Sequence, residues 1–259
     1  MNQQAAKAFL NNGWEVVAAQ ALTNEPPPSE FYEGIKYYTP SNDDDMMGRK
    51  TALDAFNKEN PDVVFLSGDP GLLVAWFQNF SGSKKILAYI PIEGEPIVNK
   101  FWRMALSESN VITCSNYGAN IVKRDVDISI DWAYHGVDHD IFNVINGRDI
   151  IRSSIGWNDK FVITCVANNV RRKQIPRLIE AVSILKHRYK RNNVYLYLHM
   201  VPFQGHWLEG HNLYEIAAMY NIAENVLFNS ELKKLHDAIP DRTNNLSYPG
   251  LAELYNACL

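Results

Sequence analysis

The sequence predicts an α/β protein built from parallel sheets that are covered by helices. Short apolar runs rich in β-branched residues, such as Phe161–Val166, alternate with stretches whose apolar residues recur at helical spacing, such as Ile175–Leu185. Strands that alternate with helices are typical of parallel sheets, whose buried strands are apolar on both faces. We therefore expect two doubly wound, Rossmann-like domains, residues 1–136 and 137–259, that meet near Gly136.

Composition limits the classes of function. The 259 residues suffice for two domains with a core each, and 46% hydrophobic and 21% charged residues are ordinary for a globular protein. The net charge of −4 argues against binding nucleic acid by bulk electrostatics. Cys114, Cys165 and Cys258 show no pairing pattern, which favours a reducing, cytoplasmic compartment. No apolar run approaches the ~20 residues that span a bilayer, and no signal peptide is visible.

The N-terminal half opens on a helix, whereas an α/β domain usually opens on a strand, a glycine-bearing turn and then a helix. We therefore expect the first strand of its sheet to be missing. The predicted strands are 14–19, 35–38, 62–67, 85–90, 110–114 and 128–133, and the predicted helices are 5–10, 49–58, 72–80, 97–106 and 116–122, the last capped by Ser115.

Three polar residues of this half follow predicted strands. Asp69, Glu93 and His135 should lie at the carboxyl edge of the sheet, where open α/β sheets bind ligands. Each also has a structural interpretation: Asp69 as a helix cap, which we prefer, Glu93 as part of a surface turn, and His135 as a satisfied structural histidine.

Two polar clusters do not predict a metal site. The run Asp43–Asp45 precedes a helix, and no histidine or further carboxylate follows it at ligand spacing. His206 and His211 flank Trp207 and Glu209 at a spacing that fits no standard metal motif. We expect no metal and no separate cofactor.

In the C-terminal half the central feature is a basic turn between a strand and a helix. The predicted strands are 161–166, 193–200 and 226–228, and the predicted helices are 148–155, 175–185, 213–220 and 251–258, with a long polar stretch at 229–247. Asn168, Arg172 and Lys173 lie between the first of these strands and its helix. Because the first amides of a helix lack internal acceptors and the helix dipole favours negative charge there, this turn suits a diphosphate. A solvated basic helix start explains the residues equally well.

The same residues carry a family resemblance. The stretch VANNVRRKQIPRLIEA, residues 166–181, resembles the donor-binding turn of retaining GT-B glycosyltransferases, in particular glycosyltransferase family 4. Lys173 matches the family lysine, and Glu180-Ala181 matches the helix that follows. The family's usual Gly-Arg falls on Ala167-Asn168 in this sequence, so the resemblance gives the role of that arginine to Arg172, beside the lysine. ITCSNYG at 112–118 and HGVD at 135–138 resemble the strand-to-helix junction and the interdomain connection of that family.

The resemblance implies transfer of a sugar, with retention, from a nucleotide-diphosphate sugar to an acceptor that is a glycan, a lipid or another molecule. Residues 1–136 would be the acceptor side, with Glu93, Asp69 and His135 as candidate catalytic groups. Residues 137–259 would bind the donor diphosphate through Arg172, Lys173 and Asn168. The family's later Glu-bearing segment does not follow Leu259, so we expect the donor domain to be incomplete.

Two other functions remain open at this point. The chain would be a non-catalytic remnant if it binds nucleotide or a partner chain without turnover, and a partner chain or self-association would then cover the missing edges. A periplasmic-type sugar binder is disfavoured because no signal peptide is visible.

Overall fold

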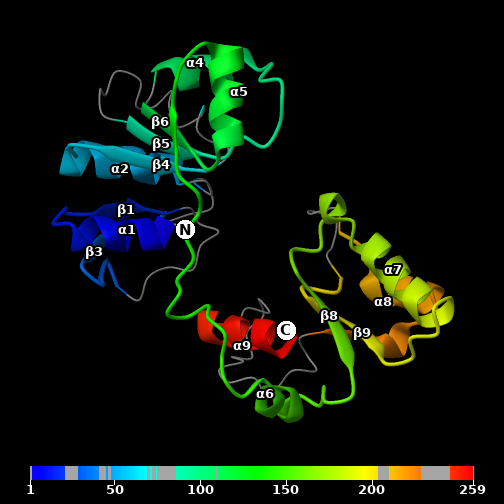
Figure 1. The fold of residues 1–259 in the computed structure, drawn as a ribbon. Helices are drawn as coiled ribbons and strands as arrows, with labels where there is room; N and C mark the ends of the chain where they lie inside the picture. The colour runs from blue at the N-terminus through cyan, green and yellow to red at the C-terminus, as the bar shows by residue number, and fades with distance from the viewer. Residues whose placement is uncertain are drawn as a thin grey trace. The chain divides into compact units, whose positions relative to one another are not determined.

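The computed structural model describes residues 2–20, 29–40, 45, 48–68, 71, 74, 86–108, 110–203, 210–228 and 246–258. Asp69, most of the expected helix 72–80 and most of the polar stretch 229–247 lie outside these residues. The chain divides into two compact units, Met1–Gly136 and Val137–Leu259, and each is described by itself (Figure 1). None of the described helices has the length and the hydropathy that a membrane span requires.

The described residues of the first unit form two sheets. In one, β1 (Val17–Ala19) pairs in parallel with β3 (Ile35–Tyr38), which also pairs in antiparallel with the unpredicted β2 (Phe31–Tyr32). The other is fully parallel and follows chain order: β4 (Val64–Ser67), β5 (Ile86–Ile90), β6 (Asn110–Thr113) and β7 (Asp131–Trp132). The parallel sheets expected from the strand–helix alternation are confirmed, although β7 is shorter than the predicted strand 128–133.

Four described helices accompany these sheets: α1 (Asn2–Asn11), α2 (Arg49–Glu59), α4 (Lys100–Glu108) and α5 (Asn116–Val126). A single core joins α2, α4 and α5 to the strands, since Ala52 of α2, Leu106 of α4 and Val122 of α5 cluster with Leu66 of β4 and the inward residues of β5. Ala19 of β1 packs against the same core although β1 belongs to the other sheet. The two sheets therefore share one interior.

The second unit is a three-layer sandwich. Its parallel sheet has the order β10 (Val226–Phe228), β9 (Val194–His199), β8 (Phe161–Val166). Leu196 and Leu198 of β9 join the core with α7 (Ile175–His187) and α8 (Leu213–Met219). The intervening Tyr197 joins the core on the other face, with α6 (Arg148–Ser154) and α9 (Tyr248–Cys258). This alternation follows from the two-residue period of a strand with both faces buried.

Arg152 holds the α6–α9 layer together. Its side chain is 8% exposed and its guanidinium donates to the carbonyls of Ala257 (2.7 Å), Trp157 (2.6 Å) and Lys160 (2.5 Å). A guanidinium presents several donors in a fixed fork, so one side chain satisfies three carbonyls, one from α9 and two from the connection between α6 and β8. The charge also lies at the carboxyl end of α9, where the helix dipole favours a cation.

At the junction of β6 and α5 the helix lies directly against the strand. The Ser115 hydroxyl accepts a hydrogen bond from the Gly118 amide at 3.0 Å, which confirms the predicted cap. A β-carbon on Gly118 would lie 2.7 Å from Oγ1 of the fully buried Thr113 and 3.1 Å from Cβ of Ile92. Because Thr113 is β-branched and buried, it has little freedom to move aside.

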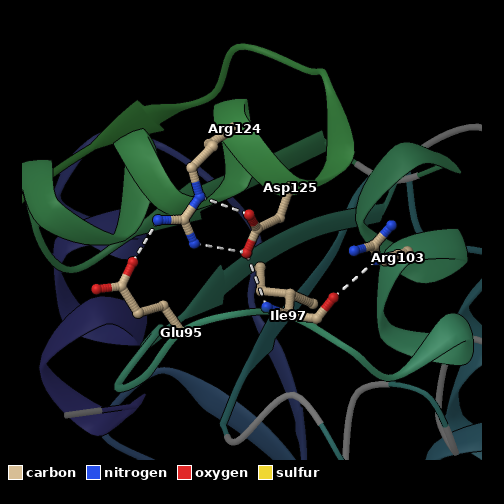
Figure 2. Close-up of polar contacts among 5 residues, drawn as sticks. All are labelled: Glu95, Ile97, Arg103, Arg124 and Asp125. Atoms are coloured by element: carbon tan, nitrogen blue, oxygen red, sulfur yellow. Dashed lines mark hydrogen bonds and ion pairs between the residues drawn. The ribbon is translucent and has the colours of Figure 1, made fainter.

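The segment after β5 is fastened to α5 by a charged network. Arg124 donates to Asp125 at 2.6 and 3.0 Å and also to Glu95, while the Asp125 carboxylate accepts from the Ile97 amide at 2.8 Å (Figure 2). Arg103 of α4 donates to the Ile97 carbonyl at 2.7 Å. The Arg124 guanidinium and the Ile97 amide lower the pKa of Asp125 to about 2. The network thus fixes residues 95–97, directly beyond Glu93.

We predict that Gly118→Ala lowers the free energy of unfolding by about 1–3 kcal/mol, because the added methyl group overpacks the contact with Thr113. Urea denaturation measures this change. Gly94→Ala is the matched control, since nothing lies within 4 Å of the place its methyl group would occupy and its backbone needs no positive φ. Equal losses in the two variants would contradict the close approach of α5 to β6.

We also predict a pH dependence that is specific to Asp125. Its folded-state pKa is depressed to about 2, and the unfolded carboxyl titrates near ~3.9, so its stabilisation is present above pH ~4 and is lost as the pH falls toward ~2. The Tm difference between wild type and Asp125→Asn should therefore be largest near neutral pH and shrink below pH ~4. The matched control is Asp127→Asn, which removes an exposed carboxylate two residues on and leaves the bonds of Asp125 to Arg124 and Ile97 in place.

Candidate functional site

The candidate anion site is the turn that follows β8. Residues Ala167–Val170 leave the strand, Arg171–Lys173 form one turn of 3-10 helix, and α7 begins at Ile175. The sequence pattern predicts Arg172 and Lys173 at the start of the long helix, whereas the structure gives them a separate turn before it. The separation arises at Gln174, which has a φ of 52° and resets the chain direction before α7 begins at Ile175, with Pro176 in its first turn.

Asn169 fixes the position of this turn, and its role was not foreseen from the sequence. Its side chain is fully buried, and its amide nitrogen donates to the carbonyls of His211 (2.7 Å) and Val201 (3.2 Å). Its amide oxygen accepts from the His211 backbone N–H at 3.1 Å. Asn169 therefore ties the loop after β8 to the loop after β9, because its side chain forms hydrogen bonds with backbone groups of Val201 and His211.

The cations of the turn are exposed and lack anionic partners within the described part of the chain. Asn168, Arg172 and Lys173 are all exposed, and no described carboxylate forms an ion pair with either cation. The structure thus brings the three predicted donor-side residues together in one turn at the carboxyl end of β8. Burial raises the pKa of the Cys165 thiol, and the positive charge of Lys173 opposes that rise. Lys173 therefore lies near the end of the strand.

Such an arrangement favours an anion with several oxygens. Arg172 supplies a planar fork of donors and Lys173 a compact charge, both beside the amino end of the 13-residue α7. Because Asn169 holds the turn at the edge of the sheet, the two cations start from a fixed backbone. A rigid support reduces the ordering cost of binding.

On the first unit, Tyr89 and His135 form a pair at the carboxyl edge of the sheet. The Tyr89 hydroxyl donates to the Ala133 carbonyl at 2.8 Å and lies 2.9 Å from Nδ1 of His135, with the two rings 5.5 Å apart. The Tyr89 hydroxyl has one proton and donates it to the Ala133 carbonyl. In the contact with His135 the hydroxyl oxygen is therefore the acceptor, and Nδ1 of His135 is the donor. The Nε2 atom is then left as an acceptor. Burial raises the pKa of Tyr89, with a smaller contribution from Cys114.

The other two candidates of this unit are not joined to that pair. Glu93 is exposed, and no described contact links it to His135 or to Tyr89. Asp69 lies outside the described residues. Sequence reasoning did not identify Tyr89, because it resembles the other apolar residues of the predicted strand 85–90. Only the pairing of β5, β6 and β7 brings it near His135.

The described residues contain no group of three His, Cys, Asp or Glu side chains placed to hold a metal ion. Asp43, Asp44 and His206 lie outside them. Asp45 caps α2 instead, since its carboxylate accepts from the amides of Lys50 (3.0 Å) and Thr51 (2.8 Å) and from the Thr51 hydroxyl (2.7 Å).

The sequence matches no protein-family model and no curated protein. Solved structures do match. WaaG, a glycosyltransferase involved in lipopolysaccharide biosynthesis, aligns with a TM-score of 0.59 and 13% identity over 88% of this chain and 64% of its own. HepE of Anabaena in complex with UDP aligns with a TM-score of 0.53 and 13% identity over 75% and 55% of the two chains.

A second HepE structure, with UDP and glucose, aligns with a TM-score of 0.56 and 13% identity over 86% of this chain and 59% of its own. The chain thus spans between 55% and 64% of the length of these proteins. At this level of identity the alignment compares folds and not substrates. Together with the parallel sheets of both units, it shows that the chain has the GT-B fold of the glycosyltransferases.

Proposed function

We propose that this chain binds a nucleotide-diphosphate sugar and transfers the sugar to an acceptor with retention at the anomeric carbon, as in glycosyltransferase family 4. The observation that carries the proposal is the pair of exposed cations, Arg172 and Lys173, without an ion-pair partner among the described residues, on a turn that the buried Asn169 holds at the carboxyl edge of the sheet. In open α/β sheets that edge is where ligands bind. HepE, one of the structural neighbours, has been solved with UDP and with UDP and glucose.

The chemistry of the transfer explains why these residue types are useful. When the bond between the anomeric carbon and the diphosphate breaks, negative charge grows on the departing oxygen. Cations and helix amides that already point to that place stabilise the charge without reorganising. In this proposal Arg172 and Lys173 bind the diphosphate, and Asn168 contributes a hydrogen bond from the same turn.

The acceptor side of the proposal rests on the first unit. His135, with Nδ1 committed to Tyr89, has Nε2 free to accept a proton or a hydrogen bond from an acceptor hydroxyl. Glu93 and Asp69 remain the other proposed catalytic groups. The acceptor itself, whether glycan, lipid or another molecule, is left open by these residues.

A second candidate function is binding of nucleotide or of a partner chain without turnover. The observation that favours it is the interruption of the first unit's sheet, where β1 and β4 each have a strand partner on one side only within the described residues. Incubation with UDP-glucose separates the two functions, because an enzyme of this class slowly releases glucose and UDP from it, whereas a binder leaves it intact.

We predict that Arg172→Ala combined with Lys173→Ala weakens UDP binding at least about tenfold, because a charge-assisted hydrogen bond contributes about 1.5–3 kcal/mol. Isothermal titration calorimetry with UDP measures the loss. The control is Arg188→Ala with Arg191→Ala, which removes the same charge from exposed positions beyond the far end of α7. Unchanged affinity in the first variant, or an equal loss in both, would refute the diphosphate assignment.

Asn168 and Asn169 should respond oppositely to truncation. Asn169→Ala leaves the Val201 carbonyl and the His211 carbonyl and amide without their side-chain partner and should cost about 1–3 kcal/mol of unfolding free energy. Asn168→Ala, at an exposed position, should keep the stability of wild type and weaken UDP binding. Urea denaturation measures the stability of both variants, and calorimetry measures their UDP affinity. Loss of stability in Asn168→Ala and none in Asn169→Ala would overturn the assignment of the anchor.

A further inference from the structure

Exposed apolar side chains lie at the same edge of the second unit's sheet as the turn that carries Arg172 and Lys173. Val166 ends β8, Val201 and Phe203 follow β9, and all three are exposed. Because β8 and β9 are parallel and pair along their full length, their carboxyl ends meet at one edge (Figure 1). An edge that combines apolar surface with cations suits a ligand that has an apolar part and an anionic part.

The backbone on either side of the Phe203 ring is held in place. Phe203 pairs with Asn212, the N-cap of α8, in an antiparallel bridge. Just before it in the chain, the carbonyls of Val201 (3.2 Å) and Pro202 (3.5 Å) accept from the side chain of Asn169. The loop that carries Phe203 is thus fastened both to the start of α8 and to the turn that carries the two cations. A ring on a fixed backbone loses little freedom when a ligand binds to it.

Exposure alone does not identify a ligand site. Phe203 is 61% exposed, but Phe161, the first residue of β8, is 62% exposed as well. Singly exposed apolar side chains are normal on protein surfaces. The two residues differ in position, since Phe161 lies at the amino edge of the sheet and Phe203 follows the carboxyl edge, where open α/β sheets bind ligands. Position therefore separates Phe203 from an ordinary surface residue.

We propose that Phe203 stacks against the base of the nucleotide whose diphosphate Arg172 and Lys173 bind. A nucleobase is flat and aromatic, so the face of a phenyl ring fits it without a hydrogen bond to any particular base edge. A nucleoside diphosphate thereby supplies both the apolar and the anionic part that this edge suits. The inference rests on the proposed function, since it takes the diphosphate site as given, and it assigns the base contact to the loop after β9.

Calorimetry of the whole chain with UDP and with inorganic pyrophosphate tests the contact. Phe203→Ala should weaken UDP binding at least about fivefold, because stacking of a base on an aromatic ring contributes that much or more. Pyrophosphate has no base, so its affinity should stay unchanged. Phe203→Leu, which keeps apolar volume without a ring, should lose UDP affinity in the same way, and Phe203→Trp should retain it. Because the side chain is exposed, all three variants should keep the stability of wild type in urea.

The matched control is Phe161→Ala, which removes an equally exposed ring from the opposite edge and should change neither affinity. Unchanged UDP affinity in Phe203→Ala, an equal loss for UDP and pyrophosphate, or an equal loss in Phe161→Ala would overturn the proposal. A loss for UDP-glucose without a loss for UDP would overturn it in favour of a contact with the sugar. In these cases wild type still binds pyrophosphate and the diphosphate site stands. If wild type binds neither UDP nor pyrophosphate, the proposed function itself fails, and the stacking contact fails with it.

Discussion

The side-chain amide of Asn169 is the contact on which the candidate donor site depends. The strand β8 ends three residues earlier, and without a fixed point the turn that carries Arg172 and Lys173 would have no defined position relative to β9. Asn169 supplies that point because its buried amide both donates to and accepts from the backbone near His211. Two exposed cations on an unanchored loop would have to be ordered by the ligand at an entropic cost. Anchoring one buried residue in the turn reduces that cost.

Sequence periodicity predicted most of the fold because the strands obey it closely. β9 alternates residues between two helical layers, so its apolar character is continuous, and the flanking helices show their own spacing. The antiparallel β2 escaped prediction because Phe31-Tyr32 is too short to show a period. The break between β1 and β4 also left no local signal, since strand order is a property of tertiary contacts. The expectation of a missing first strand came from the helix that opens the chain, and it stays a prediction.

The candidate site was predictable to the extent that its residues are close together in the sequence. Asn168, Arg172 and Lys173 stand in one turn, so charge and the strand-to-helix position sufficed to identify them. Asn169 was missed because one asparagine of a pair looks like the other, and burial alone separates them. Tyr89 and His135 are 46 positions apart and meet only through the pairing of three strands. Glu93 was chosen for its place after a strand, and no described contact of its carboxylate supports that choice.

The two units also differ in how completely their sheets are built. In the second unit both faces of the described strands are covered and the edge loops are tied together by a buried amide, which suits a rigid ligand site. In the first unit the Arg124–Asp125 network fixes the segment beyond Glu93, yet β1 and β4 do not pair with each other among the described strands. The residues of β1, and those of β4 other than Leu66, are only partly buried. The candidate anion site therefore stands on the unit whose described strands are covered on both faces and whose edge loops are tied together.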